Sequence, residues 1–317
     1  MLSTTESVNS TFDCVVDSPV AFNPPVQRSH HFKTFLSVLA SINIVAAIVS
    51  SPSNFIVICT ISRTPGLRRT PSNILILGLA ISDLVVSLVA LPSSSVLCVS
   101  THKPQLYCVT SIVFSTSIFI FGGISICTLT VITVDRFLAV QLHLRYQELV
   151  TTKRYVFVLI GVWVLFISFT LMRLYINTRQ YYILAFVTLV ILLLINMTLI
   201  FKISRVIRRH SMQIQAQQQS VQQSTDMPGY KKSVNTMYFV IGAFLVCSVP
   251  FAVSLLSPER LYNTVEMHYL FALSSSLVML NGVLNPIIYF WRIEEIRNNA
   301  VRLMRTICKR DGSPIEP

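Results

Sequence analysis

Charged residues are scarce in this chain of 317 residues: 12% are Asp, Glu, Lys or Arg, whereas 53% are hydrophobic. A soluble domain carries about 25% charged residues, and the mean hydropathy of +0.65 is too high for an ordinary water-exposed surface. This composition excludes a disordered chain, a collagen-like repeat and most soluble enzymes. The seven cysteines form no CxxC pair and have no spacing typical of a metal site.

Long apolar runs are what the sequence has in abundance. A helix needs roughly 20 apolar residues to cross a bilayer core, and every backbone N–H and C=O group inside lipid must be hydrogen-bonded within the protein, which favours helices. The runs do not alternate in polarity as the strands of a membrane β-barrel do. We therefore predict an all-α membrane protein, a bundle of seven transmembrane helices with spans at 34–61, 73–98, 107–135, 155–173, 181–203, 234–257 and 267–291.

The remaining segments complete the predicted organisation. Residues 1–33 lack the basic start and apolar core of a secretory signal, and we expect an extracellular tail there, followed by the seven-span domain over 34–291. The Gln- and Ser-rich stretch 213–224 is typical of a mobile loop. In the last segment, 292–317, the apolar residues fall on one stripe of a helix that would lie on the inner leaflet. These residues are 293, 296, 300, 303, 304 and 307.

The basic residues predict the orientation in the membrane. Nineteen of the 25 Lys and Arg residues lie in segments on one side of the spans. The positive-inside rule places that side in the cytoplasm and the N-terminus outside the cell, as expected for a plasma-membrane protein. The sequon at Asn9 is then a glycosylation site on the outer tail. The net charge of +12 faces anionic lipid and an acidic partner rather than nucleic acid. Cys308, after the last amphipathic stretch, is either a palmitoylation site or an unmodified cysteine.

One carboxylate lies fully inside a predicted span. A charge at the bilayer centre costs about 2.5–3.5 kcal/mol on insertion scales, so Asp83 needs a proton, a partner or a cation. Ser125, Asn281 and Asn285 are polar residues of other spans. With Asp83 they could offer oxygen ligands to a small hard cation such as sodium. The alternative is that these residues only join helices through hydrogen bonds.

Two prolines predict kinks in the last two spans. Pro286 follows Asn285 in span seven, and Pro250 lies in span six. Each proline removes one helical hydrogen bond and bends the axis. Asn285 could satisfy the carbonyl that Pro286 leaves free, or it could turn towards Asp83. The kinks are either static or part of a switch, and two kinks beside a buried carboxylate favour the switch.

Asp135 and Arg136 end the third span. In isolation, this pair is typical of an arginine that extends to the membrane surface beside a counter-ion. The pair has an ordered set of companions, however. These are Asn54 in span one, Leu79-Ala-Ile-Ser-Asp83 in span two, Trp163 in span four, Pro250 in span six and Asn285-Pro286-Ile-Ile-Tyr289 in span seven. Together these motifs resemble the rhodopsin-like (class A) G-protein-coupled receptors over nearly the whole chain. The segment after Asp135 is most similar to adenosine- and melanocortin-type receptors.

The resemblance implies a mechanism. An extracellular ligand would bind between the spans, span six would swing outward about Pro250, and Arg136 would leave Asp135 to admit a heterotrimeric G protein. The Asp83 cluster resembles the family's sodium site, which would make sodium an allosteric modulator. The residues implied in coupling and switching are Asp135, Arg136, Phe137, Phe244, Pro250, Pro286 and Tyr289.

The sequence departs from the family pattern inside the bundle and at its inner side. Ser248 stands where the family usually has tryptophan, so we expect Phe244 to carry more of the switch. Tyr230 stands where many members have an acid that holds the arginine, which predicts raised basal activity. Span five has no proline, and His143 stands where the second inner loop often has one.

The outer cysteines also depart from the pattern. The segment between spans four and five has no cysteine, so the family's usual disulfide to span three cannot form. A bridge between Cys98 and Cys108 or between Cys14 and Cys108 is possible outside the cell.

The positions expected to face the ligand are largely apolar. Ile118 stands where aminergic receptors have their acid, and Met279 stands where opsins have the retinal-linked lysine. We therefore expect an uncharged, lipid-like or aromatic small molecule, or a peptide. The candidate pocket residues are Phe114, Ile118, Phe119, Phe251, Glu266, His268 and Met279.

The sequence contains no catalytic constellation, so we do not expect an enzyme. The alternatives to a signalling receptor are a seven-helix scaffold that does not couple and, less favoured because inverted repeats are absent, a small transporter.

Overall fold

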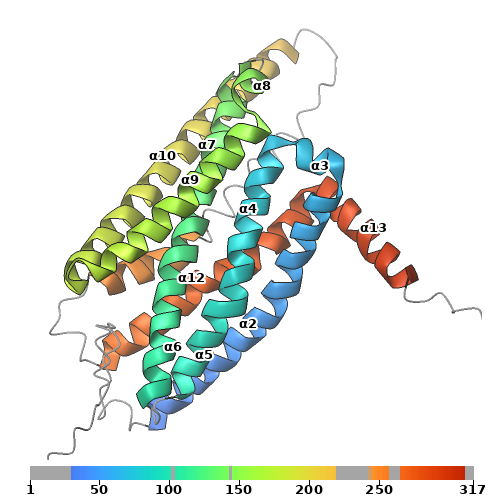
Figure 1. The fold of residues 1–317 in the computed structure, drawn as a ribbon. Coiled ribbons are helices and arrows are strands. Elements are labelled where there is room, and N and C mark those ends of the chain that lie inside the picture. Colours follow the sequence, from blue (N-terminus) through green and yellow to red (C-terminus); the bar gives the residue numbers. More distant parts are fainter. Residues whose placement is uncertain are drawn as a thin grey trace, which may run out of the picture.

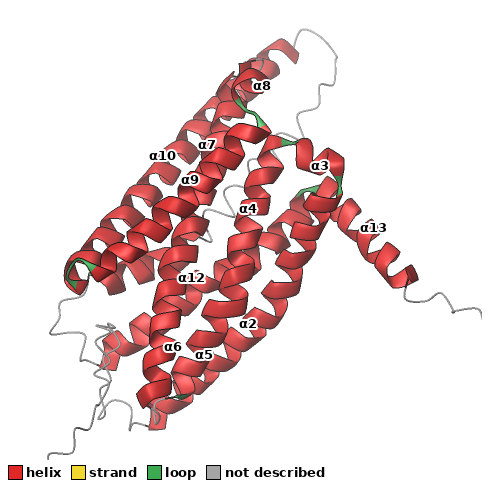
Figure 2. Ribbon diagram, in the orientation of Figure 1, coloured by secondary structure: helices red, strands yellow, loops and turns green. Residues whose placement is uncertain are grey.

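A computed structural model describes residues 30–100, 104–142, 145–218, 244–256 and 265–310, together with residue 242. Within these ranges the chain forms helices and short connections, with no strand (Figures 1 and 2). Six helices are long and apolar enough to cross a membrane, and a shorter apolar helix, Phe244–Leu255, lies between the fifth and the last of them in the sequence. The predicted seven-helix bundle is confirmed. The six long spans are His30–Arg63, Pro71–Val99, Leu106–Leu142, Thr152–Leu174, Thr178–Val206 and Glu266–Trp291.

Several spans are built from more than one helical segment. The first three are α2 (His30–Arg63), α4 (Pro71–Val85) with η1 (Val86–Ala90) and α5 (Leu91–Val99), and α6 (Pro104–Ser117) with η2 (Ile118–Gly122) and α7 (Gly123–Leu142). The others are α9 (Thr152–Leu171) with η4 (Met172–Leu174), α10 (Thr178–Gln218), the Phe244–Leu255 helix and α12 (Val265–Arg292). The short helices α3 (Pro65–Arg69) and α8 (Tyr146–Leu149) lie at one end of the bundle, which we call the α3–α8 end.

The prediction of a loop over 213–224 is wrong for its first part. Helix α10 continues through Gln218. Gln, Ala and Met are good helix formers, and the first glycine or proline after the span is Pro228. Nothing in the sequence therefore ends the helix where its apolar part stops.

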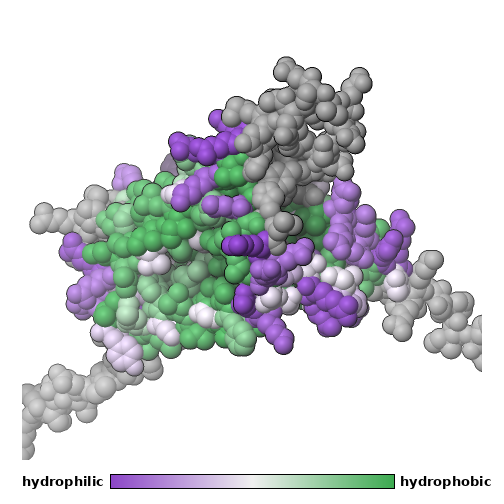
Figure 3. All heavy atoms as spheres, turned by 90° about the horizontal axis from the view of Figure 1, so that it is seen from above, coloured by the Kyte–Doolittle hydropathy of each residue, from purple (hydrophilic) through white to green (hydrophobic). Residues whose placement is uncertain are grey.

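The outer surface of the bundle is apolar, and much of its interior is polar. Large side chains such as Phe157, Val246 and Ile48 are 73%, 72% and 66% exposed. Figure 3 shows hydrophobic residues over a broad area of the surface seen from above. Serine and asparagine side chains are buried instead. This reversal suits a protein whose surroundings are lipid, in which polar side chains join helices by hydrogen bonds.

Buried asparagines join helices that are far apart in the sequence. Asn43 of α2 donates to the Ser94 hydroxyl at 3.2 Å and to the Ser276 hydroxyl at 3.1 Å, and so connects α2 with α5 and α12. Asn196 of α10 donates to Thr130 at 2.7 Å and accepts from Thr133 at 2.9 Å, which ties α10 to α7. These bonds fix the rotation of each helix about its own axis.

Two wider, π-helical turns interrupt the second and third spans. Turn η1 follows Asp83 closely in the second span, and η2 ends three residues before Ser125 in the third. The two turns contact each other inside the bundle. Such turns are frequent at functional sites because they rotate the side chains that follow them. Here they lie directly beside the buried carboxylate.

Helix α13 (Glu294–Arg310) follows the last span and points away from the bundle at the α3–α8 end (Figure 1). Ile296 and Ala300 on its apolar stripe are buried, whereas Met304 further along is 41% exposed. The helix contacts α2 and α12. Its first turns therefore pack on the bundle, and its later apolar residues are left for another apolar environment.

Candidate functional site

Asp83 is the centre of a hydrogen-bonded cluster that joins three spans. Its side chain, 3% exposed, lies on α4. One carboxylate oxygen accepts from the Ser125 hydroxyl of α7 at 3.0 Å, and the other accepts from the Asn285 amide of α12 at 2.8 Å. The Ser125 hydroxyl also lies 3.0 Å from that of Ser82. The structure therefore brings together three of the four residues that the sequence grouped, through direct contacts.

The fourth residue, Asn281, lines the same small cavity as Asp83, Ser125 and Asn285. Its side-chain nitrogen has no hydrogen-bond partner among the described residues. The cavity wall also includes Gly282, where an added Cβ would lie 3.4 Å from the Asp83 Cβ. Carboxylate and hydroxyl oxygens suit a small hard cation. A carboxylate bonded only to neutral donors still benefits from a positive charge. The residues present therefore fit a monovalent cation.

Pro286 frees the carbonyl of Gly282, four residues before it in α12, because proline has no N–H to donate. Asn54 of α2 donates to this carbonyl at 3.0 Å, and the Ser50 hydroxyl donates to it at 3.1 Å. Asn285 turns to Asp83 instead. The sequence left two alternatives open for Asn285, and the structure has the one in which it bonds to Asp83. The carbonyl that Pro286 leaves free is hydrogen-bonded by side chains of α2 instead.

The switch candidates of spans six and seven meet near this cluster. Phe244 and Tyr289 are buried in one apolar cluster with residues of α2, α4 and α7. The Tyr289 hydroxyl has no hydrogen-bond partner within the described part of the chain. Pro250 lies inside the Phe244–Leu255 helix and is half-buried.

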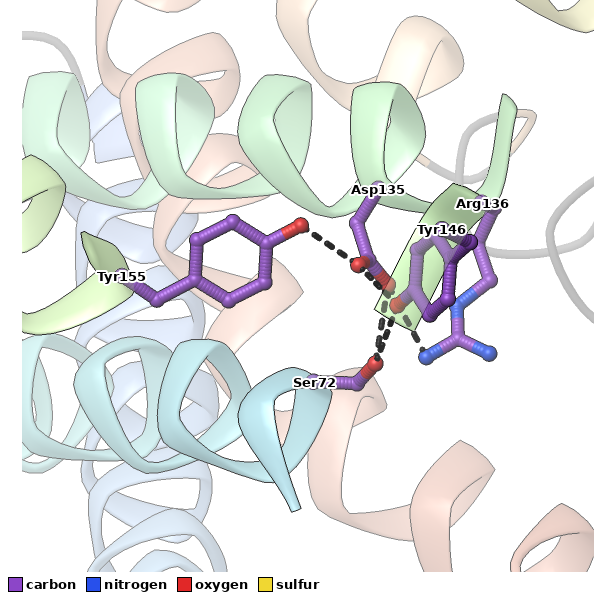
Figure 4. Close-up of polar contacts among 5 residues, drawn as sticks. All are labelled: Ser72, Asp135, Arg136, Tyr146 and Tyr155. Carbon is purple, nitrogen blue, oxygen red and sulfur yellow. Dashed lines mark hydrogen bonds and ion pairs between the residues drawn. The ribbon is translucent and has the colours of Figure 1, made fainter. Parts of the chain in front are cut away.

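Asp135 forms a second polar cluster at the α3–α8 end of the bundle (Figure 4). The side chain is fully buried and forms an ion pair with Arg136 at 3.1 Å. The hydroxyls of Tyr146 in α8 and Tyr155 in α9 each donate to the same carboxylate oxygen at 2.6 Å. Ser72, at the start of α4, donates to the other oxygen at 2.9 Å. Four side chains thus surround one carboxylate and connect α7 to α4, α8 and α9.

The partners of Asp135 differ in how freely they can leave it. Burial first, and then the hydrogen bond to Asp135, raise the pKa of the Tyr146 phenol, which keeps it a donor at neutral pH. The Arg136 side chain is 35% exposed and points to the edge of the cluster. Phe137 packs instead beside Val140 and Ile203. Arg136 is therefore the partner that can move without unpacking a helix.

The predicted pocket residues are divided among three cavities. Ile118, Phe119 and Phe251 line an apolar cavity between the third, fourth, fifth and sixth spans. Phe114 and His268 line another, between α2, α5, α6 and α12. Met279 lines the Asp83 cavity, and the exposed Glu266 lines none of these three. The first two cavities have volumes of about 70 and 50 Å³, below the roughly 300–1,000 Å³ of small-molecule sites, so a drug-sized ligand has to part the surrounding side chains.

Comparison with known families identifies the broad class of the protein. The profile described as "7 transmembrane receptor (rhodopsin family)" matches residues 53–182 and 175–289. The chain belongs to this receptor family. The receptor is similar to melanocortin receptor 5 of Ovis aries, with 25% identity over 291 residues that cover 86% of this chain and 88% of the relative. It is also similar to melanocortin receptor 5 of Bos taurus, at 26% identity, with 90% and 91% of the two chains covered.

Family membership settles the broad class. The chain is a multi-pass membrane receptor of the G-protein-coupled type and not an enzyme. As in its family, its partners are a G protein and an extracellular ligand. The resemblance to class A G-protein-coupled receptors that was inferred from the ordered motifs is confirmed.

The cysteines of the receptor correct one prediction. Cys98 is a free cysteine, whereas Cys108 is disulfide-bonded, so the Cys98–Cys108 alternative is wrong. Cys98 packs beside Phe32 and Leu36 and lines the cavity between α2, α5, α6 and α12. Several predicted features lie outside the residues, or the side chains, that the structure describes. These are the tail with Asn9 and Cys14, His143, Tyr230 and the side chain of Cys308.

Three partners of Asp135, namely Ser72, Tyr146 and Tyr155, were not predicted from the sequence of the receptor. A signal was available for the tyrosines, because both lie near the predicted inner ends of spans and could reach back with a polar tip. Ser72 gave none, since it follows Pro71 and reads as an ordinary first residue of a helix.

Proposed function

We propose that this receptor binds an uncharged, lipid-like or aromatic ligand from outside the cell and activates a heterotrimeric G protein through an outward movement of span six. The observation that supports the ligand class is the lining of the cavity that contains Ile118, Phe119 and Phe251, which includes no ionisable side chain. A charged group placed there would lose its water without gaining a partner. The relatives are melanocortin receptors by name, and a peptide ligand is the alternative.

The Asp135 cluster supports the coupling step. Three hydroxyl donors remain on Asp135 when Arg136 departs. A buried charge that loses its only partner is strongly destabilising, and these donors lower that cost. The receptor can therefore alternate between two packings, one with Arg136 on Asp135 and one with Arg136 turned to the G protein. A ligand that binds one packing better shifts the balance between them.

The proposed orientation follows from the basic residues. The α3–α8 end would lie in the cytoplasm and the N-terminal tail outside, at the plasma membrane. Asn9 would carry a glycan, Cys14 would pair with Cys108, and Cys308 would be palmitoylated. At the Asp83 cluster, Ser125, Asn281 and Asn285 would help to hold sodium in the inactive packing. With no acid at Tyr230, basal activity would be high.

A ligand screen against a panel of Gα reporters tests this function. We expect ligand-dependent activation of at least one Gα subtype, with apolar uncharged compounds among the activators. Surface expression without activation of any Gα subtype, by ligand or in the basal state, would favour the non-coupling scaffold. Substrate flux in proteoliposomes would instead identify a transporter.

A further inference from the structure

The apolar cavity between the third, fourth, fifth and sixth spans contains a polar atom that the bundle leaves unused. Ser248 lines this cavity and is 1% exposed. Its hydroxyl has no hydrogen-bond partner among the residues that the structure describes. Several other buried serines of the bundle bond to their own helix, as Ser254 does to the Phe251 carbonyl at 2.7 Å. A buried unpaired hydroxyl costs free energy that a ligand group can recover.

The rest of the lining restricts what that ligand can be. Apart from Thr188 and Ser248, the lining consists of aliphatic and aromatic residues and two glycines. Gly122 and Gly123 keep the wall at the end of η2 free of side chains. The site therefore suits a long apolar body with one group that donates or accepts a hydrogen bond.

The walls of the cavity also indicate the path by which a ligand reaches it. Phe166 and Phe169 of α9 form one side, and Ala185, Leu189 and Leu192 of α10 form the other. Helix α9 packs on α4, η2 and α7, and α10 packs mainly on α7, whereas α9 and α10 meet through side chains such as the rings of Phe169 and Tyr181, whose centroids are 5.4 Å apart. The outward faces of both helices are apolar. Side chains rather than closely packed backbones thus separate the cavity from the hydrocarbon of the membrane here, and a lipid chain that parts them reaches the cavity.

We infer that this cavity binds an uncharged lipid with a single hydroxyl or carbonyl group, which hydrogen-bonds to Ser248 while its chain lies between α9 and α10. The inference rests on the proposed function and names the ligand class. It also places the ligand deeper than the mouth of the bundle, where Ser248 replaces the bulky tryptophan usual in the family. The cavity shares Ile118, Gly122, Phe244 and Val278 with the Asp83 cavity, so the bound chain lies against the switch residues.

Photolabelling of the purified full-length receptor in nanodiscs tests the inference. The probe is a long-chain fatty alcohol with a diazirine in its chain and a terminal alkyne, compared with the matching carboxylate and trimethylammonium probes. We expect the alcohol to label peptides of α7, α9 and α10 at the cavity at lower concentration than either charged probe. Equal labelling by all three probes, or labelling confined to outward-facing residues, would overturn the inference.

Matched variants locate the polar contact. Ser248→Ala removes the hydroxyl, and we expect the half-saturating concentration of the alcohol probe to rise about five-fold, the effect of one hydrogen bond. Ser254→Ala is the control, because this buried serine on the same helix bonds to its own backbone and does not line the cavity. Equal shifts in the two variants, or none in Ser248→Ala, would exclude Ser248 as the anchor.

A second pair of variants tests the cavity itself without disturbing the hydroxyl. At Gly122 an added Cβ would meet only the Ile118 side chain, at 3.8 Å, so Gly122→Ala should fold and reduce the cavity. Gly161→Ala is the control, since Gly161 is exposed on α9 with no atom near its Cβ position. We expect weaker labelling of Gly122→Ala only, and equal labelling of both would contradict the site. Labelling needs no G protein, so a receptor that labels without coupling refutes the proposed function alone. A receptor that couples without labelling refutes this inference alone.

Discussion

Asn285 of α12 donates a hydrogen bond to Asp83 of α4 at 2.8 Å, across 202 positions of sequence. This bond places the kink at Pro286 beside the carboxylate within the spans, so any change in the charge of Asp83 acts directly on the seventh span. Ser125 holds the second carboxylate oxygen from α7. We therefore expect the three spans to respond together to a cation in the cavity.

Removing the charge of Asp83 should abolish the response to sodium. We expect sodium, compared with choline at equal ionic strength, to suppress basal nucleotide exchange by the wild-type receptor and to have no effect on Asp83→Asn. The reason is that the amide lacks the negative charge that a cation requires. Ser87→Ala is the control, because Ser87 is buried nearby and bonds only to the Leu84 carbonyl. A sodium response that survives in Asp83→Asn would remove the ion site.

The tyrosines on Asp135 should raise basal activity by making Arg136 easier to release. We expect the double variant Tyr146→Phe/Tyr155→Phe to hold Arg136 more tightly and to lower basal exchange by at least roughly ten-fold, because hydrogen bonds to a charge are worth about 1.5–3 kcal/mol each. Tyr175→Phe, at an 86% exposed position, serves as the control. Increased basal exchange in the double variant would show that the tyrosines restrain the switch instead.

The carbonyl of Gly282 should make a measurable contribution to stability through α2. Asn54→Ala removes one of its two donors, and we expect a loss of about 1–2 kcal/mol, near the upper range for such bonds between membrane helices. Thermal unfolding in detergent can be followed with a thiol-reactive dye, since Cys247 is buried and unpaired. Ser53→Ala is the control, because its hydroxyl bonds only within α2. Equal stability of the two variants would contradict this role of α2.

The contact between α7 and α9 should depend on the absence of a side chain at residue 123. A Cβ on Gly123 would overlap the ring of Phe166, and overpacking of this kind costs about 1–3 kcal/mol. We expect Gly123→Ala to be destabilised in the same unfolding assay and Phe166→Leu to restore much of the loss when combined with it. Additive losses in the double variant would show that Phe166 is not the obstacle.

The helices and the Asp83 cluster could be predicted because the free-energy cost of placing polar groups in lipid is large and depends mainly on the residues of each span itself. A carboxylate and an asparagine in the middle of two spans avoid the lipid by facing the interior of the bundle, where each finds the other as a hydrogen-bond partner. The apolar runs were equally decisive for the spans, although nothing in them predicted that α10 would continue to Gln218.

The partners of Asp135 could not be predicted in the same way. They depend on how α9 is rotated against α4 and α7, which is set by close contacts such as Gly78 with Leu159. Likewise, the sequence left Asn285 a choice between Asp83 and the Gly282 carbonyl. The choice is decided by Asn54 and Ser50, which lie more than 200 positions away. The division of the predicted pocket among several cavities has the same cause, since small differences in helix rotation decide which wall a side chain joins.

The most direct test of a two-state receptor with Arg136 at its inner side is nucleotide exchange on purified Gα. It is measured for one variant of Asp135 and one of Arg136, which should change the exchange rate in opposite directions. Both variants are compared with wild type at matched surface expression and thermal stability. We expect Asp135→Asn to raise basal exchange and Arg136→Ala to abolish both basal and ligand-driven exchange. Full exchange by Arg136→Ala on the Gα that the wild type activates would contradict the role of this residue and, with it, the proposed switch.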